Sequence, residues 1–223
     1  MKMTTLYAAL SGAFLLGAAT LVPAQTSGTT TGTAATGTTA TTDTTTKSNR
    51  SAAKSEKKAD KNEAKAEEDR IEADYKAAKD QCKSQSGNAK DVCEKEAKGK
   101  EKVAKAELKA KQKPSANSEY EVAKAKAEAQ YDVAKEKCDD QKGNAKDVCK
   151  KEAKAAHTAA KGEAKVEKTA ATSGAAAANA KATEVKNDTM DAQYSAAKER
   201  CDSMKGDGKD KCIADAKKKY NKS

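Results

Sequence analysis

The chain has little from which a hydrophobic core could be built. Its 223 residues include no Trp and a single Phe, Phe14, and aromatic residues make up only 3% of the total. Charged residues make up 35%, and much of the apolar remainder is alanine, which buries little area. This composition falls far below the level at which burial offsets chain entropy in a globular core. The sequence therefore predicts either a disordered chain or an elongated helical one.

Residues suited to catalysis or to metal binding are also scarce. The chain has one histidine, His157, in a charged segment without a matching Ser, Cys or carboxylate constellation. We interpret it as a solvated surface residue. There is no nucleophile elbow, no phosphate-binding glycine loop and no paired-carboxylate site. We therefore expect a protein that is not an enzyme, with no catalytic residue, no cofactor and no metal site.

The N-terminus has the layout of an export signal. Lys2 precedes an apolar run at residues 8–22, and Val22 and Ala24 stand three and one positions before a cut after Ala24. This pattern is typical of a secretory signal peptide, and the run is short for a membrane span, which needs about twenty residues. We expect residues 1–24 to be a cleaved signal peptide and the protein to be periplasmic or secreted. An uncleaved membrane anchor is the alternative.

A threonine-rich segment follows the predicted signal. Residues 25–52 consist largely of Thr, Gly and Ala with few charges, a composition that builds no core and supports no stable helix. We expect a disordered linker that acts as a spacer, or alternatively an O-glycosylated stalk. Strong helix formers (Ala, Lys, Glu and Gln) dominate the rest of the chain.

The helix-forming part repeats one motif three times. Twelve-residue stretches with a cysteine at each end, such as CDDQKGNAKDVC at 138–149, recur with the pattern A-x-Y-x2-A-K-x2-C-x4-G-x3-D-x-C-x3-A. The offsets within the motif do not change, so the repeat reflects a repeated structure. Before each first cysteine, apolar residues are spaced four, three and four apart, as on the buried stripe of a coiled-coil helix. The stripe residues of the repeat are Tyr75, Ala78, Tyr131, Ala134, Tyr194 and Ala197.

Each motif predicts a helical hairpin. The glycine five residues after the first cysteine suits the C′ position of a first helix, and the next residue suits the N-cap of a second. Pro114 would end the first hairpin, and Ser118 with Glu121 resembles a capping box that opens the next. The predicted turn residues are Gly87 and Asn88, Gly143 and Asn144, and Gly206 and Asp207. We expect an all-α fold of three tandem hairpins, at residues 53–113, 114–173 and 174–223.

The cysteines are predicted to link the two helices of each hairpin. In an antiparallel hairpin, the two cysteines of one motif lie on facing stripes, where their Cα atoms can come within reach of a disulfide. Six cysteines allow fifteen pairings, and the repetition favours Cys82–Cys93, Cys138–Cys149 and Cys201–Cys212. Zinc sites and redox-active dithiols usually have closer cysteine spacings, so we treat metal and redox roles as lesser alternatives. Whether the hairpins stack or stay extended is left open by helix faces so poor in apolar residues.

The segments KAEEDRIEADYKAAK and SEYEVAKAKAEAQYDVAKEK resemble TolA-type cell-envelope proteins in composition, over roughly residues 52–223. A closer similarity is to small exported Lys/Ala-rich proteobacterial proteins that carry this cysteine repeat and are often labelled TolA-like. The resemblance to TolA implies a helix that spans the periplasm and links inner-membrane machinery to the outer membrane. The chain departs from TolA in its cleavable N-terminal segment and in having no globular domain after the helices.

The net charge of +10 offers a second interpretation. Acidic residues are interspersed among the basic ones, as in exposed helices with many ion pairs, so we do not expect nucleic-acid binding, which would need a purely basic stripe. We expect a non-enzymatic structural or interaction protein of the cell envelope. The alternative is a cationic module that binds anionic envelope polymers such as lipopolysaccharide, and thiol redox or metal handling comes third. The expected partner is an envelope protein or such a polymer.

Overall fold

The computed structural model describes the backbone of residues 42–222 and the side chains of residues 59–222. The predicted signal peptide and residues 25–41 of the predicted linker lie outside this part. The chain divides into two units, Met1–Thr45 and Thr46–Ser223, and nearly all described residues belong to the second.

The described part is helical throughout. Its elements are α1 (Thr42–Cys82), α2 (Gly87–Gln112), α3 (Ala116–Lys137), a single 3-10 turn η1 (Cys138–Asp140), α4 (Gly143–Cys201) and α5 (Asp207–Lys219). Helix α4 is broken at Gly174, whose φ of 81° and ψ of 175° are not helical, so it consists of two arms, residues 143–173 and 175–201. The three hairpins are therefore α1 with α2, α3 with the first arm of α4, and the second arm with α5. The predicted all-α fold of three disulfide-linked hairpins is confirmed.

Two predicted element boundaries need correction. Helix α1 begins at Thr42, inside the segment 25–52 that we expected to be a disordered linker. No glycine or proline stands between Gly37 and Gly87, so neither of the two strongest helix breakers interrupts the helix, and its threonines do not prevent it. The capping box of α3 is also different from the expected one, because Ser115 is the N-cap and its hydroxyl accepts from the backbone N–H of Ser118 at 3.1 Å.

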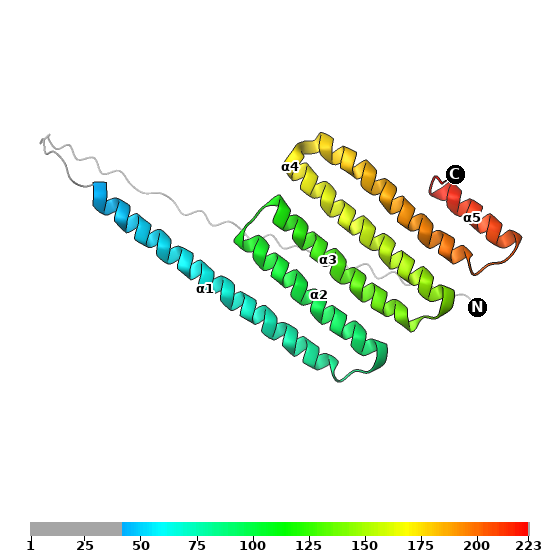
Figure 1. Cartoon of the computed structure of the whole chain (residues 1–223), viewed down its shortest axis with the longest axis horizontal. Coiled ribbons are helices and arrows are strands. Elements are labelled where there is room, and N and C mark those ends of the chain that lie inside the picture. Colours follow the sequence, from blue (N-terminus) through cyan, green and yellow to red (C-terminus); the bar gives the residue numbers. More distant parts are fainter. Residues whose placement is uncertain (1–41, 223) are drawn as a thin grey trace, which may run out of the picture. The chain divides into compact units, whose positions relative to one another are not determined.

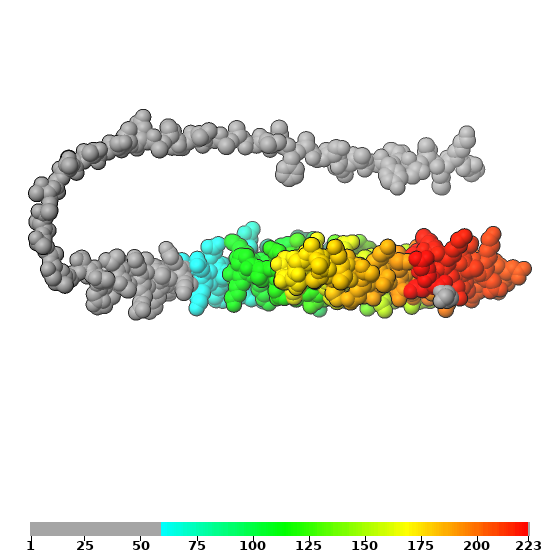
Figure 2. Space-filling view, turned by 90° about the horizontal axis from the view of Figure 1, so that it is seen from above, coloured from blue at the N-terminus to red at the C-terminus, as the bar shows by residue number. Residues whose placement is uncertain are grey.

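The helices lie side by side in the order of the sequence. Helix α2 packs against α3, α3 against α4, and α4 against α5, with neighbours antiparallel (Figure 1). Helix α1 is joined to α2 by a disulfide near one end and by an ion pair between Glu63 and Lys111, 3.2 Å apart, near the other. In the edge-on view of Figure 2 the coloured helices form a layer one helix thick. The hairpins are therefore packed laterally, which the sequence had left open.

Small residues make up the interior of this layer. Three side chains are fully buried, and all are cysteines: Cys82, Cys138 and Cys201. The other buried apolar residues are Ile71, Ala97, Ala125, Ala127, Ala155, Ala164, Ala178, Ala196 and Ala216. Helices that meet through alanine approach more closely than helices that meet through leucine, because the separation of the axes depends on the side chains at the contact.

Two glycines mark the closest approaches between hairpins. A Cβ atom built on Gly99 of α2 would lie 2.8 Å from the Cβ of Ala129 in α3. The equivalent space beside Gly162, between the two arms of α4, is filled by the side chain of Val185. Both glycines are buried. Neighbouring hairpins therefore pack at a distance that excludes even a methyl group at these points.

Candidate functional site: disulfides, turns and inter-hairpin contacts

Each hairpin is closed by one disulfide next to its turn. Cys82–Cys93, Cys138–Cys149 and Cys201–Cys212 have Cα–Cα distances of 5.6, 5.6 and 5.7 Å, well within the range that disulfides require. The three predicted pairings are confirmed, and no cysteine is left as a free thiol. Disulfides persist in oxidising compartments and are rare in the cytosol. They therefore indicate an oxidising, extracytoplasmic environment for this protein.

The stripe tyrosines lie inside the hairpins, seven residues before each first cysteine. The six predicted stripe residues, Tyr75, Ala78, Tyr131, Ala134, Tyr194 and Ala197, are all half-buried. Tyr131 stacks on His157 with ring centroids 4.6 Å apart, and Tyr194 packs against Tyr220 with centroids 6.5 Å apart. Both partners stand eight residues after the second cysteine. Counting outward from the turn would have identified these pairs from the sequence.

The prediction that His157 is a solvated surface residue is wrong. The side chain is half-buried against Tyr131, and its Nε2 atom is buried without a hydrogen-bond partner. Burial and the nearby Lys161 ammonium lower the pKa of His157, whereas the carboxylates of Glu128 and Asp132 oppose this shift. The histidine lies on the inward stripe of its helix, facing Tyr131.

The turn glycines occupy a different position from the one predicted. Gly87, Gly143 and Gly206 have φ values of +56°, +55° and +58°, a region that favours glycine. We expected them to end the first helix of each hairpin, but each stands where the second helix begins. The first helix instead ends in a turn with a backbone hydrogen bond between residues three apart. In the first hairpin, the N–H of Gln85 donates to the carbonyl of Cys82 at 3.0 Å.

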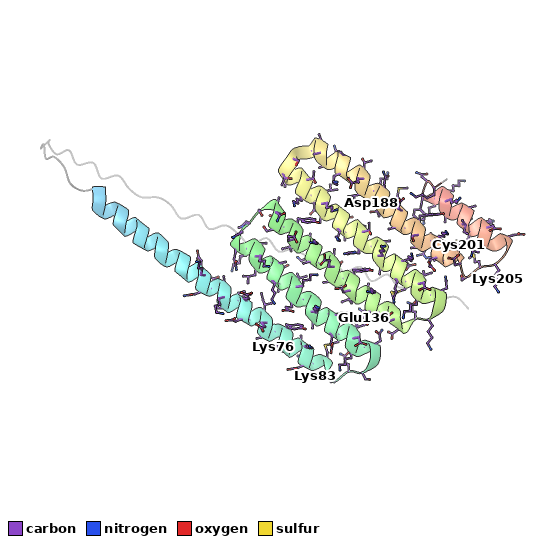
Figure 3. All side chains as sticks on the ribbon, viewed as in Figure 1. Lys76, Lys83, Glu136, Asp188, Cys201 and Lys205 are labelled. Atoms are coloured by element: carbon purple, nitrogen blue, oxygen red, sulfur yellow. A yellow bond between two sulfur atoms is a disulfide. The ribbon has the colours of Figure 1, made fainter. Side chains whose placement is uncertain are left out.

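The turn asparagines were predicted as N-caps, and this prediction is also wrong. The amide of Asn88 donates to the backbone carbonyl of Glu136 at 3.1 Å, and that of Asn144 donates to the carbonyl of Glu199 at 2.8 Å. Each acceptor lies two residues before the first cysteine of the next hairpin, and Figure 3 shows Glu136 on α3. Each asparagine therefore connects one hairpin to the next. Asp207 takes the corresponding place in the third turn and lies in the first turn of α5.

Ion pairs accompany these hydrogen bonds at equivalent positions. Glu96 pairs with Lys137 at 3.4 Å, and Glu152 pairs with Arg200, whose Nε lies 2.8 Å from the carboxylate. In both pairs the acid stands three residues after a second cysteine, and the base directly precedes the next first cysteine. Such exposed pairs contribute little stability. Their repetition shows that the two interfaces between hairpins share one register.

The second turn also carries a compact charge cluster. The carboxylate of Asp139 lies 2.8 Å from Lys146 and 2.7 Å from Lys150. Hydrogen bonds from these two ammonium groups lower the pKa of Asp139 to about 2. In the third turn, the contact of Asp202 with Lys209 at 2.9 Å lowers the pKa of Asp202 in the same direction. These pairs connect the turn to the first turns of the following helix.

A groove with an excess of lysines runs between α2 and α3. It has a volume of about 730 Å³, and its lining contains five lysines and two glutamates. Ion pairs join Lys124 to Glu121 at 3.4 Å and Lys102 to Glu128 within the groove. The lysines are Lys102, Lys105, Lys109, Lys113 and Lys124.

Two further findings concern the described residues. Between residues 42 and 222, no helix combines the length and the apolar character that crossing a membrane requires. In the same part of the chain, no three His, Cys, Asp or Glu side chains gather in a way that could hold a metal ion. Comparison of the chain with known protein families, with curated proteins and with solved structures found no match.

Proposed function

We propose that the protein is a non-enzymatic scaffold or spacer of the bacterial cell envelope, exported to the periplasm by a signal peptide at residues 1–24. The observation that carries this proposal is the set of three hairpins, each closed by its own disulfide. A layer one helix thick exposes both of its faces and so offers a large surface from few residues. The disulfides hold each hairpin of such a layer together where a thin alanine interior could not.

The TolA-like composition supports the envelope as the site of action. The helices are long and lysine- and alanine-rich, and their exposed faces carry many ion pairs within one helix, such as Lys76 with Glu72 at 3.0 Å. Helices of this kind serve as spacers whose surfaces stay soluble without a globular partner. The partner in this proposal is an envelope protein that contacts one face of the layer.

A second candidate function is supported by the groove between α2 and α3. Its five lysines against two glutamates would attract a polymer that carries phosphate or carboxylate groups, such as lipopolysaccharide. Binding of this kind would depend on long-range attraction and on charge-assisted hydrogen bonds. It would therefore weaken as salt is added.

The two candidates are separated by one experiment on the intact protein. Cells are fractionated, thiols are blocked, and the envelope fraction is washed at low and at high salt. A scaffold held by protein contacts stays in the envelope fraction at high salt with all six cysteines oxidised, whereas a polyanion-binding module is released. Recovery in the cytoplasm with free thiols would contradict both.

Binding to purified lipopolysaccharide gives the second candidate its own test. The double variant Lys109→Gln, Lys113→Gln removes two charges from the groove, and Lys98→Gln, Lys100→Gln removes two charges from α2 outside the groove. Groove binding requires that only the first variant loses affinity at low salt. Equal losses for both would show attraction to net charge alone and would remove the groove from consideration.

A further inference from the structure

The two interfaces between hairpins follow one set of rules. The turn asparagine five residues before a second cysteine, Asn88 or Asn144, donates to a carbonyl of the next hairpin. The acid three residues after that cysteine pairs with a base in the next hairpin. The residue six after the cysteine is small and buried: Gly99 in the first interface and Ala155 in the second. Interfaces with the same register and the same contacts could in principle be repeated without limit.

The last hairpin keeps an acid, Asp215, three residues after its second cysteine but breaks the other two rules on its outer face. Asp207 stands at the asparagine position, and a carboxylate cannot donate a hydrogen bond to a carbonyl. Lys218 stands six residues after Cys212, where the inner hairpins have Gly99 and Ala155. Both Asp207 and Lys218 are exposed. Because a single added carbon at Gly99 would already lie 2.8 Å from its neighbour, a lysine at this position prevents the same close approach.

The first hairpin breaks the complementary rule. The residue directly before its first cysteine is Gln81, where the second and third hairpins have Lys137 and Arg200. A carboxylate from another hairpin would therefore have no cation with which to form an ion pair at this position. Ala73, the equivalent of Ala129 in the close contact with Gly99, is exposed on α1. The outer face of α1 thus keeps the small residue of the interface and lacks its charge.

We infer that α1 and α5 are end caps, which keep the hairpin interface from forming between molecules. The surface that joins hairpins within the chain is a head-to-tail surface, and between copies such a surface would join molecules end to end, into a filament unless the rotation closes a ring. Repeat proteins need terminal repeats with altered outer faces for this reason. A second copy of this chain is the partner that fits these edges best. Its binding is made unfavourable by Gln81, Asp207 and Lys218.

The test restores the inner rules at both ends of the full-length chain. The triple variant Gln81→Arg, Asp207→Asn, Lys218→Ala gives α5 the amide and the small residue and gives α1 the base. The control Gln85→Arg, Asp210→Asn, Lys217→Ala makes the same chemical changes at other exposed positions. Sedimentation velocity over a range of concentrations is the measurement, with the three disulfides checked by non-reducing peptide mass spectrometry.

The inference requires that wild type and control stay monomeric while the average mass of the triple variant at least doubles with concentration. A wild type that forms end-to-end filaments, or a correctly oxidised triple variant that stays monomeric, would overturn it. The reverse variant Asn88→Asp, Gly99→Lys decides the matter if the triple variant is not oxidised correctly. It places the end-cap residues at an inner interface and should separate the first two hairpins, which raises the radius of gyration by small-angle scattering. An unchanged radius would overturn the inference.

Discussion

The side-chain amide of Asn88 donates a hydrogen bond to the backbone carbonyl of Glu136, 3.1 Å away and 48 residues further along the chain. The bond joins the turn of the first hairpin to the last turn of α3 in the second. Its equivalent, from Asn144 to Glu199, has the same position in the next interface. Together with the ion pairs that cross the same interfaces, the two asparagines fix the register in which alanine faces alanine.

Replacing one of these asparagines should loosen one interface. For Asn88→Ala we expect a loss of about 1 kcal/mol in the free energy of unfolding, the usual net value of one hydrogen bond. Urea unfolding followed by circular dichroism measures it. Asn179→Ala is the matched control, because Asn179 is an exposed helical residue and alanine there should be neutral or slightly stabilising. Equal effects at both sites would argue against an interface role for Asn88.

Removal of one disulfide should have a larger effect. The double variant Cys138→Ala, Cys149→Ala opens a loop with a sequence separation of 11 residues, and loop-closure entropy assigns such a loop about 3 kcal/mol. We expect the urea midpoint to fall accordingly, with the other two disulfides intact by peptide mapping. Reduction of all three bonds in the wild type should lower it further. A midpoint that does not change would show that the helices hold the hairpin without the bond.

Gly99→Ala tests the close approach between hairpins. Alanine is the better helix former by about 1 kcal/mol, but its Cβ would lie 2.8 Å from that of Ala129, so we expect net destabilisation. Gly208→Ala is the control, because Gly208 lies in α5 with open space around it and should be stabilised by the same substitution. Opposite signs in thermal unfolding are the expected result. Stabilisation at both sites would mean that α2 and α3 can separate without cost.

Acid should weaken the second turn through Asp139. The folded protein holds the pKa of Asp139 at about 2, below its ordinary value of 3.8. The unfolded chain therefore binds the proton more readily, so the stabilisation is complete above pH 3.8 and is lost as the pH falls towards 2. In Asp139→Asn this part of the acid sensitivity should be absent, and Asp140→Asn is the charge-matched control. The measurement is the thermal midpoint through this pH range at low salt. A parallel loss of stability in the wild type and in Asp139→Asn would contradict the assignment.

His157 should make stability depend on pH in a higher range. Burial lowers its pKa below the ordinary value of 6.5, so protonation favours the unfolded chain and stability falls as the pH drops below this value. His157→Phe keeps a flat ring against Tyr131 and removes the unpartnered Nε2 atom. We expect the variant to be more stable than the wild type at low pH and to lose this dependence. Identical pH profiles from about pH 7.5 to about pH 5 would show that the imidazole does not titrate there.

The sequence was sufficient for features that depend on local spacing. The four-three-four spacing of Ile71, Tyr75, Ala78 and Cys82 defines a helix stripe, and cysteines at equal distances from a turn must face each other in a hairpin. These regularities predicted the helices and all three disulfides. They needed no knowledge of what the hairpins contact.

Features that depend on the next hairpin could not be predicted in this way. An asparagine after a turn glycine is equally suited to a local N-cap and to a distant carbonyl, and only the partner of Asn88, 48 residues away, decides between them. The lateral packing of the hairpins depends on alanine and glycine faces, which in a sequence this rich in alanine do not stand out. His157 is a different case, because its partner Tyr131 lies in the same hairpin, and counting outward from the turn would have predicted the contact.

The short separation within each cysteine pair also has a kinetic consequence. Partners are 11 residues apart, whereas Cys93 and Cys138 of neighbouring pairs are 45 apart in the sequence. Because the probability that two points of a flexible chain meet falls with the three-halves power of their separation, the correct partner is favoured about eightfold before any helix has formed. In a chain that emerges residue by residue, both thiols of a pair are also exposed to oxidant before the next pair appears. Correct pairing is thus favoured by the order of the sequence itself, and the oxidised hairpins can form one after another without waiting for the rest of the layer.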